Sequence, residues 1–333
     1  MYFAGCWRTD WTCWYQTTGN PATLTIWSLI GPQPPQGGTT TWTADSGTAS
    51  VGKGDPATPL KNTGQPSCPL SAGNPINIGT GNKYQPETDY QGGGDFPLTF
   101  ECVYNSDTST FSEGFGTASG WRHSYERSIV STANTSLVVA YRHDGRAYNF
   151  SLVGSGWLPV ADVNLRLSGS ASTGWQLTTE DGSVETYDAA GKLQAIKSLG
   201  GTTQTLTYGT NGLLSTITHS NGRRLTLSYD GASRLVSLQD PAGGLTRYGY
   251  NAATGDLETV TYPDATPADL SDNPGKTYLY NEAANTSNTN LPHALTGIVD
   301  ENGKRFATFQ YDAQRRAIST EHAGHAGFVG VSY

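Results

Sequence analysis

The chain has 333 residues and a formal net charge of −8, with 35% hydrophobic and 14% charged residues. Lysine and arginine do not cluster, which argues against nucleic acid and anionic membranes as partners, because both require concentrated positive charge. No continuous run of about 18 apolar residues occurs, so the sequence predicts no membrane-spanning helix.

Residues 1–30 are rich in tryptophan and form the first predicted segment. Their pattern is compatible with a small strand pair or with the remnant of a preceding domain. The start has neither the basic region nor the continuous apolar region of a signal peptide. Either export uses another route, or this start is not the native one.

Four cysteines fall in the first third of the chain, and they allow three disulfide pairings. Cys6 and Cys13 would close the shortest loop, and the other two are Cys68 and Cys102. Disulfides persist in oxidising compartments, whereas cytosolic thiols stay reduced. The sequence is therefore compatible both with disulfides and with four free thiols.

Two segments of different character follow. Residues 31–73 contain seven prolines among glycine, serine and threonine, a composition that predicts an extended linker of low order. Residues 74–167 combine short alternating stretches with glycine-rich turns, which predicts a β-rich module. No linker separates this module from the next segment, so we expect the two to pack as one body.

Residues 168–333 contain a repeat that is marked by a tyrosine before Asp, Asn or Gly. The first four tyrosines follow at steps of 21 residues, and the next two steps are 30 and 31 residues. A short fixed period with longer members is typical of a repeat architecture with loop insertions. The repeat tyrosines are Tyr187, Tyr208, Tyr229, Tyr250, Tyr280 and Tyr311.

Each unit is predicted to contain two antiparallel strands joined by a turn. Gly191, Gly212 and Gly255 supply the positive φ that such a tight turn needs. The spacing is too short for a crossover helix, so the sequence predicts an all-β fold, an antiparallel spiral of hairpins preceded by the β-rich module. The terminal stretch GFVGVSY is predicted to be a strand with an open outer edge.

Two motifs could carry chemistry, and each has a simpler structural interpretation. Asp240 and Pro241 stand in the middle of a unit, where DPAGG is typical of a hairpin turn. His322 and His325 supply only two ligands, whereas zinc sites use three or four protein ligands.

Acidic residues offer two candidate pairs for glycoside hydrolysis, Glu180 with Asp181 and Asp95 with Glu101. That chemistry needs two carboxyl groups at a defined separation across a cleft, and turn positions are the simpler interpretation here. No nucleophile motif and no phosphate-binding loop occurs. We therefore predict no catalytic residue, no metal and no cofactor, and hence that the segment is not an enzyme.

Several motifs in order resemble one known family. They are NPINIGTGNKYQPETDY at residues 74–90, FPLTF at residues 96–100 and GWRHSYER at residues 120–127. These stretches resemble the N-terminal module of Rhs proteins, and the Tyr-Asp units resemble the YD repeats of the same family. The resemblance covers residues 74–333.

The resemblance implies a strand spiral that closes into a hollow shell around a C-terminal toxin used in bacterial competition. Its implied partners are the remaining repeats, the toxin and a secretion machinery. This chain departs from the family pattern, because it has about six units, no terminal autocleavage segment and no toxin domain. We therefore expect the N-terminal part of a larger protein or a truncated product, either secreted or at the cell surface.

Two other functions stay open. Tyrosine and tryptophan on an open β surface can stack on sugar rings, which would make the chain a carbohydrate-binding or adhesion protein with surface glycans as partners. The regular position of the repeat tyrosines favours packing between adjacent strands instead. A hydrolase is the third hypothesis.

Overall fold

The computed structural model describes residues 7–8, 11–12, 65–66, 71–106, 115, 120–131, 136–160, 163–266, 269 and 272–333. The chain divides into two compact units, one of residues 1–58, 67–69 and 333, the other of residues 59–66 and 70–332. In the first unit, β1 (Trp7–Arg8) and β2 (Trp11–Thr12) form an antiparallel pair within the tryptophan-rich segment. Most of the predicted linker lies outside the described residues.

A five-stranded antiparallel sheet, here called the module sheet, opens the second unit. Along β6, Phe100, Cys102 and Tyr104 are buried while Glu101 is partly exposed, so one face of the sheet is apolar. The strands are β3 (Ser71–Ala72), β4 (Ile76–Asn77), β5 (Asn82–Gln91), β6 (Thr99–Asn105) and β7 (Trp121–His123).

A second antiparallel sheet of 19 strands, here called the repeat sheet, contains the rest of the second unit and confirms the predicted all-β class. Among the described residues the helical elements are two short 3-10 turns, η1 (Ala283–Asn285) and η2 (Ala323–His325). No helix in this part of the chain has the length and apolar character needed to cross a membrane. The strands are β8 (Ser128–Ser131), β9 (Leu137–Tyr141), β10 (Ala147–Val153), β11 (Gly156–Pro159), β12 (Arg166–Ser170), β13 (Gly174–Thr178), β14 (Val184–Tyr187), β15 (Leu193–Lys197), β16 (Thr203–Tyr208), β17 (Leu214–His219), β18 (Arg224–Tyr229), β19 (Leu235–Gln239), β20 (Leu245–Tyr250), β21 (Leu257–Thr261), β22 (Gly275–Tyr280), β23 (Leu295–Val299), β24 (Arg305–Tyr311), β25 (Ala317–His322) and β26 (Ala326–Gly330).

The repeat units share one register. In each unit the tyrosine ends the first strand and lies opposite the apolar residue that begins the second, with a register shift beside the tyrosine. The turn between the strands contains a residue with positive φ, which is 80° at Gly191 and 79° at Gly212. Ser233 and Arg315 adopt the same left-handed conformation in units that lack a glycine there.

The repeat tyrosines also join neighbouring units. The Tyr250 hydroxyl donates to the Leu235 carbonyl at 2.7 Å, and the Tyr311 hydroxyl donates to the Leu295 carbonyl at 2.8 Å. Each acceptor carbonyl lies two residues before the first residue that pairs with the next unit. For Leu235, that first paired residue is Ser237. The phenol therefore satisfies a carbonyl that the ladder leaves open.

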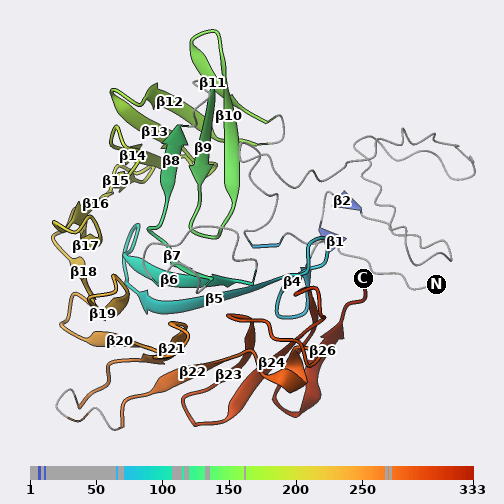
Figure 1. The fold of residues 1–333 in the computed structure, drawn as a ribbon. Coiled ribbons are helices and arrows are strands. Elements are labelled where there is room, and N and C mark those ends of the chain that lie inside the picture. The colour runs from blue at the N-terminus through green and yellow to red at the C-terminus, as the bar shows by residue number, and fades with distance from the viewer. Residues whose placement is uncertain are drawn as a thin grey trace, which may run out of the picture. The chain divides into compact units, whose positions relative to one another are not determined.

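The two sheets form one body in which the repeat sheet curves around the module sheet. Figure 1 shows β8–β11 above, β12–β19 along the side and β20–β26 below, with β5–β7 between the upper and lower parts. Strands β8–β15 of the repeat sheet also close into a ring, because Ser128 of β8 forms an isolated antiparallel bridge with Lys192, the residue before β15. The Ile129 amide donates to the Gly191 carbonyl at 2.9 Å, which seals β8 against the segment before β15.

The change of layer occurs earlier in the chain than the predicted boundary at residue 167. Strands β8–β11 belong to the repeat sheet, and Trp157 of β11 pairs with Leu167 of β12, the strand that spans that boundary. Antiparallel strands continue a ladder whether or not they carry the tyrosine motif, because the hydrogen bonds use only the backbone. The layer changes between β7 and β8.

Gly191→Ala and Gly212→Ala form a matched pair that tests the ring closure. Both glycines have the same positive φ, but an added Cβ at Gly191 would lie 1.7 Å from the Ile129 oxygen, whereas at Gly212 the nearest atom is the flexible Lys192 Nζ at 3.6 Å. Gly212→Ala should lower the free energy of unfolding by about 1–2 kcal/mol. Gly191→Ala should lower it by about 3–4 kcal/mol, because the steric overlap adds to the backbone strain.

Denaturant unfolding of the two purified variants measures both effects. Equal losses of stability would show that β8 does not close on the Gly191 turn in solution.

Candidate functional site

The contact between the module sheet and the repeat sheet is the candidate functional site, because it fixes the curvature of the repeats. The Tyr104 hydroxyl donates to the His293 carbonyl at 2.8 Å and accepts from the Leu295 amide at 2.9 Å. The Trp121 Nε1 donates to the Tyr280 hydroxyl at 2.9 Å. Tyr104 and Trp121 are fully buried, so both rings combine a large apolar contact with a satisfied polar atom.

Asp89 forms the polar centre of this contact. A register shift in β5 between Thr88 and Tyr90 leaves Asp89 without a partner in the ladder, and such a bulge re-aims a side chain. Its carboxylate accepts from the Tyr248 hydroxyl at 2.8 Å, from the Tyr262 hydroxyl at 3.2 Å and from the Cys102 thiol at 3.0 Å. Two of these donors belong to the repeat region, so Asp89 joins the two sheets.

Burial changes the proton affinity of this cluster. Desolvation raises the pKa of Asp89 to about 6, although its three hydrogen-bond donors act in the opposite direction. Burial next to Asp89 also raises the pKa of the Cys102 thiol and of the Tyr248 hydroxyl. The thiol and the phenol therefore stay protonated and continue to donate.

A row of polar side chains extends along the same strand. The Lys83 Nζ donates to the Gln85 Oε1, the Gln85 Nε2 donates to Glu87, and Lys276 of β22 pairs with Glu87, each at 2.9 Å. Burial lowers the pKa of Lys83 well below its ordinary value. Its Nζ lies 4.2 Å from the centre of the Phe309 ring of β24, so this row reaches the repeats as well.

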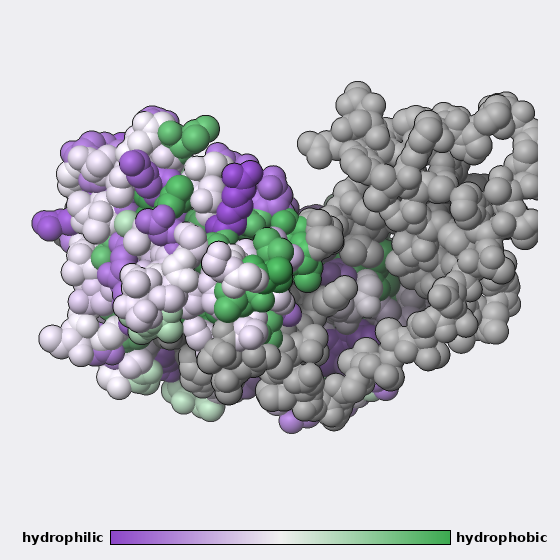
Figure 2. All heavy atoms as spheres, turned by 90° about the horizontal axis from the view of Figure 1, so that it is seen from above, coloured by the Kyte–Doolittle hydropathy of each residue, from purple (hydrophilic) through white to green (hydrophobic). Residues whose placement is uncertain are grey.

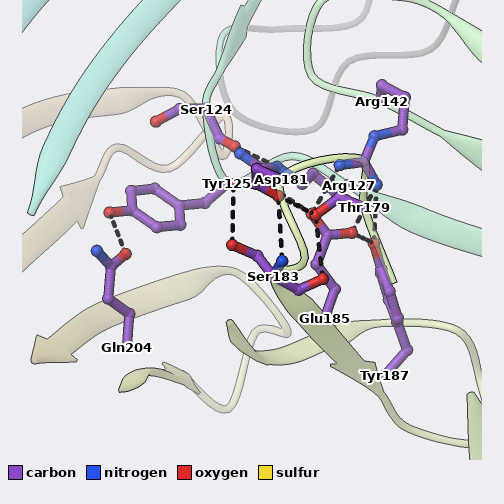
Figure 3. A network of polar contacts seen from close by, with 10 residues as sticks. All are labelled: Ser124, Tyr125, Arg127, Arg142, Thr179, Asp181, Ser183, Glu185, Tyr187 and Gln204. Atoms are coloured by element: carbon purple, nitrogen blue, oxygen red, sulfur yellow. Dashed lines mark hydrogen bonds and ion pairs between the residues drawn. The ribbon is translucent and has the colours of Figure 1, made fainter. Parts of the chain in front are cut away.

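A second polar network lies where the first strands close into a ring (Figure 3). The two Nη atoms of Arg142 each lie 2.6 Å from a Glu185 oxygen, which makes a bidentate pair. Arg127, just before β8, and the Tyr187 hydroxyl also donate to this carboxylate. The side chain of Glu185 is fully buried.

The charges of this network keep Glu185 ionised. Burial alone would raise the pKa of Glu185, but Arg127 and Arg142 outweigh it and hold that pKa well below its ordinary range. A buried carboxylate with paired charges and satisfied hydrogen bonds fixes geometry, and removal of one partner is strongly destabilising. Glu185 therefore holds together the segments before β8, after β9 and within β14.

The sequence carried one signal for Glu185 that the prediction missed. The residue two positions before each of the other repeat tyrosines is apolar, as at Leu206 and Leu227, whereas the first unit has Glu185 before Tyr187. A charged residue on the buried side of a strand needs a partner. The two arginines that fill this role come from the module segment, about 40–60 residues earlier, and no local pattern indicates them.

The repeat tyrosines take up structural positions. Tyr187 and Tyr311 are buried, and the other four are partly buried against the core. Cations lie over two of the rings, Lys192 over Tyr208 at 4.4 Å and Arg234 over Tyr250 at 4.6 Å. One face of each of these two rings is therefore already occupied, which leaves less surface for a stacked sugar.

The turn residues singled out in the sequence lie apart from one another. Asp240 accepts from the backbone amides of Ala242 and Gly244, as a turn-capping residue does. His325 pairs with Glu321 at 2.7 Å. The described residues contain no group of three or more His, Cys, Asp or Glu side chains that could hold a metal ion.

The structure does not bring together the two carboxylates of either predicted pair. It instead brings one member of each pair to the same cavity. Glu180 and Asp95 are exposed, and Asp95 accepts from the Thr202 hydroxyl at 3.3 Å. Asp181 and Glu101, from different predicted pairs, line one cavity.

The disulfide that the sequence left open for Cys102 does not form in this structure. Its thiol is free and buried, and it donates to Asp89 in the centre of the contact between the sheets. The remaining three cysteines, Cys6, Cys13 and Cys68, lie outside the described residues.

Protonation of Asp89 is expected to stabilise the protein. The pKa of Asp89 is about 6 in the folded chain and about 3.9 in an unfolded chain, so the folded state binds the proton more tightly. The stabilisation is full below about pH 4 and is lost as the pH rises through about 6. The loss should reach at most about 3 kcal/mol.

Denaturant unfolding of the wild type and of Asp89→Asn, which does not titrate, isolates this contribution. The stability of the wild type should fall relative to that of the variant between about pH 4 and pH 7. Parallel pH profiles would contradict the role given to Asp89.

Comparisons with known proteins agree with this architecture in part of the chain. The family model described as "Domain of unknown function (DUF6531)" matches residues 73–150. The model described as "RHS Repeat" matches residues 208–245 and 229–267. No curated protein matches the chain.

Two solved structures illustrate the similar proteins. The crystal structure of TcdB2-TccC3-Cdc42 is 14% identical with a TM-score of 0.30, and the match covers 75% of this chain and 14% of that one. The Photorhabdus luminescens Tc holotoxin pore with mutated TccC3 is 13% identical with a TM-score of 0.31, over 77% of this chain and 14% of that one. This chain thus spans about one seventh of the length of either.

The matched models follow the order seen in the structure. The first covers the module sheet and the opening strands of the repeat sheet, and the second covers units with the shared tyrosine register. The chain is an Rhs/YD-repeat protein.

Proposed function

We propose that this chain is the N-terminal wall of an Rhs shell, which encloses a C-terminal toxin and delivers it in bacterial competition. The role of the segment is structural, and the toxin and later repeats are its partners. The observation that carries this proposal is the curved repeat sheet, held open from within by the module sheet. We further propose export by a specialised secretion route.

The shared junction between units supports a wall that extends by repetition. Tyr280 and Tyr311 each donate to a leucine carbonyl of the preceding unit, as earlier tyrosines do. The last strand, β26, pairs with β25 along one edge. Its Phe328 side chain is 57% exposed, and an apolar edge strand is a template for another strand.

Exposed apolar side chains also gather at the other end of the repeat sheet. Figure 2, seen from the end where β8–β11 lie, shows hydrophobic residues on this face. The exposed large apolar residues of these strands and their ends are Val130, Leu152, Val153, Leu158 and Val160. Val153 and Leu158 lie on one face of the β10–β11 hairpin and Leu152 on the other, because Leu152 pairs with Trp157 and Leu158 with Ser151.

The acidic residues support a role without catalysis. Asp181 accepts from the Thr179 hydroxyl at 2.6 Å and from the Ser183 amide at 3.1 Å, so its carboxylate is engaged in the turn. Glu185 is saturated by arginines. A glycosidase needs two carboxyl groups that face a substrate, and of the three carboxylates that line the cavity, Glu101, Asp181 and Glu185, only Glu101 lacks a hydrogen-bond or ion-pair partner among the described residues.

The 333-residue chain should self-associate when it is expressed alone, because β26 offers an apolar edge. Phe328→Lys should lower the association, since a charged residue on an edge strand opposes pairing. Leu199→Lys is the matched control, because Leu199 is even more exposed, at 81%, but lies in the turn after β15. Light scattering over a range of concentrations measures the effect.

A monomeric wild type at high concentration, or an equal effect of the two lysine substitutions, would contradict an extendable edge. Enclosure itself is tested on a longer gene product that contains any following repeats. Its C-terminal segment should resist protease as long as the repeats stay folded.

The purified chain should not hydrolyse glycosides. The variants Glu101→Gln and Asp181→Asn should therefore behave like the wild type in assays with chromogenic glycosides. A turnover that disappears in one of these variants would overturn the structural assignment and favour the hydrolase hypothesis.

A further inference from the structure

A cavity with several charged side chains lies between the module and the first repeat unit. Its volume is about 350 Å³, and its walls come from β6, from the loop between β7 and β8, and from the β13–β14 turn. Glu101, Arg127, His143 and Asp181 contribute charged or titratable groups, and Ser124 contributes a hydroxyl. The volume suits a small metabolite, and these groups offer it polar contacts beside an apolar wall that includes Phe96 and Ile196.

Arg127 brings positive charge to one side of the cavity. Two guanidinium groups, Arg127 and Arg142, share the single carboxylate of Glu185. Arg127 uses its Nη1 for Glu185 and its Nε for the Ser124 carbonyl, which is 2.8 Å away. Its Nη2 has no partner among the described residues, so Arg127, which lines the cavity, keeps unused donors.

The opposite charge comes from Glu101. Its carboxylate forms no hydrogen bond and no ion pair with any described residue, although the strand β6 holds it at the cavity wall. Burial and the neighbouring Asp144 raise the pKa of Glu101, while Arg127 acts against them. A partly buried carboxylate without a partner is costly, and a cationic group beside it would remove that cost.

His143 adds a neutral group to the cavity wall. Its Nδ1 is buried and has no hydrogen-bond partner. Burial, with Arg127 and Arg142 nearby, lowers the pKa of His143 well below its ordinary value, so the ring stays neutral. A neutral imidazole donates through one nitrogen and accepts through the other, so the ring adds a polar group without a formal charge to the cavity wall.

We propose that this cavity binds a small zwitterion of the amino-acid class, with its ammonium group at Glu101 and its carboxylate at Arg127. A simple anion would meet Glu101 and Asp181, and a simple cation would meet Arg127. A neutral sugar would leave both charges uncompensated. A molecule with both charges a few ångströms apart satisfies Glu101 and Arg127 together.

Calorimetric titration of the 333-residue chain with L-alanine tests this site directly. Lactate, in which a hydroxyl replaces the ammonium, and ethylamine, which lacks the carboxylate, are the matched ligands, and glucose represents the sugars. L-alanine should bind, and the other three should bind at least about tenfold more weakly, because each lacks a charge-assisted contact.

Glu101→Gln keeps the shape of the side chain and removes its charge, so it should weaken L-alanine binding at least about tenfold. Glu180→Gln is the matched control in the exposed turn beside the cavity, and it should bind like the wild type. Thermal unfolding should show that both variants are folded. No binding of L-alanine, equal binding of lactate or glucose, or unchanged binding by Glu101→Gln would each overturn the proposal.

Discussion

A single β-sheet buries one face only if another layer covers it, and this constraint decides the architecture of the chain. The repeat units are too short to contribute a covering helix, so their inner leucines need a layer from elsewhere. The module sheet supplies that layer through Tyr104, Trp121 and Asp89, whose polar atoms all find partners in the repeat region. Curvature and burial therefore have the same origin.

The two polar centres have different physical roles. Asp89 accepts only from neutral donors, so its charge is uncompensated and its proton affinity rises. Glu185 meets two guanidinium groups, and its charge is fixed at every physiological pH. The first centre joins the two sheets in a manner that responds to protons, and the second closes the ring of β8–β15 in a manner that does not.

The sequence predicts the repeats well, because their information is local. The tyrosine period, the apolar residue two positions earlier and the turn glycines all lie within one unit, and the all-β class follows from them. The site depends on pairs such as Tyr104 with Leu295, which are 191 residues apart. The local sequence also gives no signal for the bulge at Asp89, because the sequence TDY indicates only a strand. The change of sheet between β7 and β8 also has no local signal, because β8–β11 join the repeat sheet without the tyrosine motif.

The distance along the chain between contacting residues also sets an order of assembly. Ser128 meets Lys192 after a separation of 64 residues, so the ring can close on the ribosome while later units are still being made. Tyr104 must wait until Leu295 has emerged, and until then the apolar face of the module sheet has no cover. The module sheet is thus synthesised first, but its apolar face is covered only after the last repeat units have been made. During this interval a chaperone, or the growing repeat sheet itself, has to shield that face.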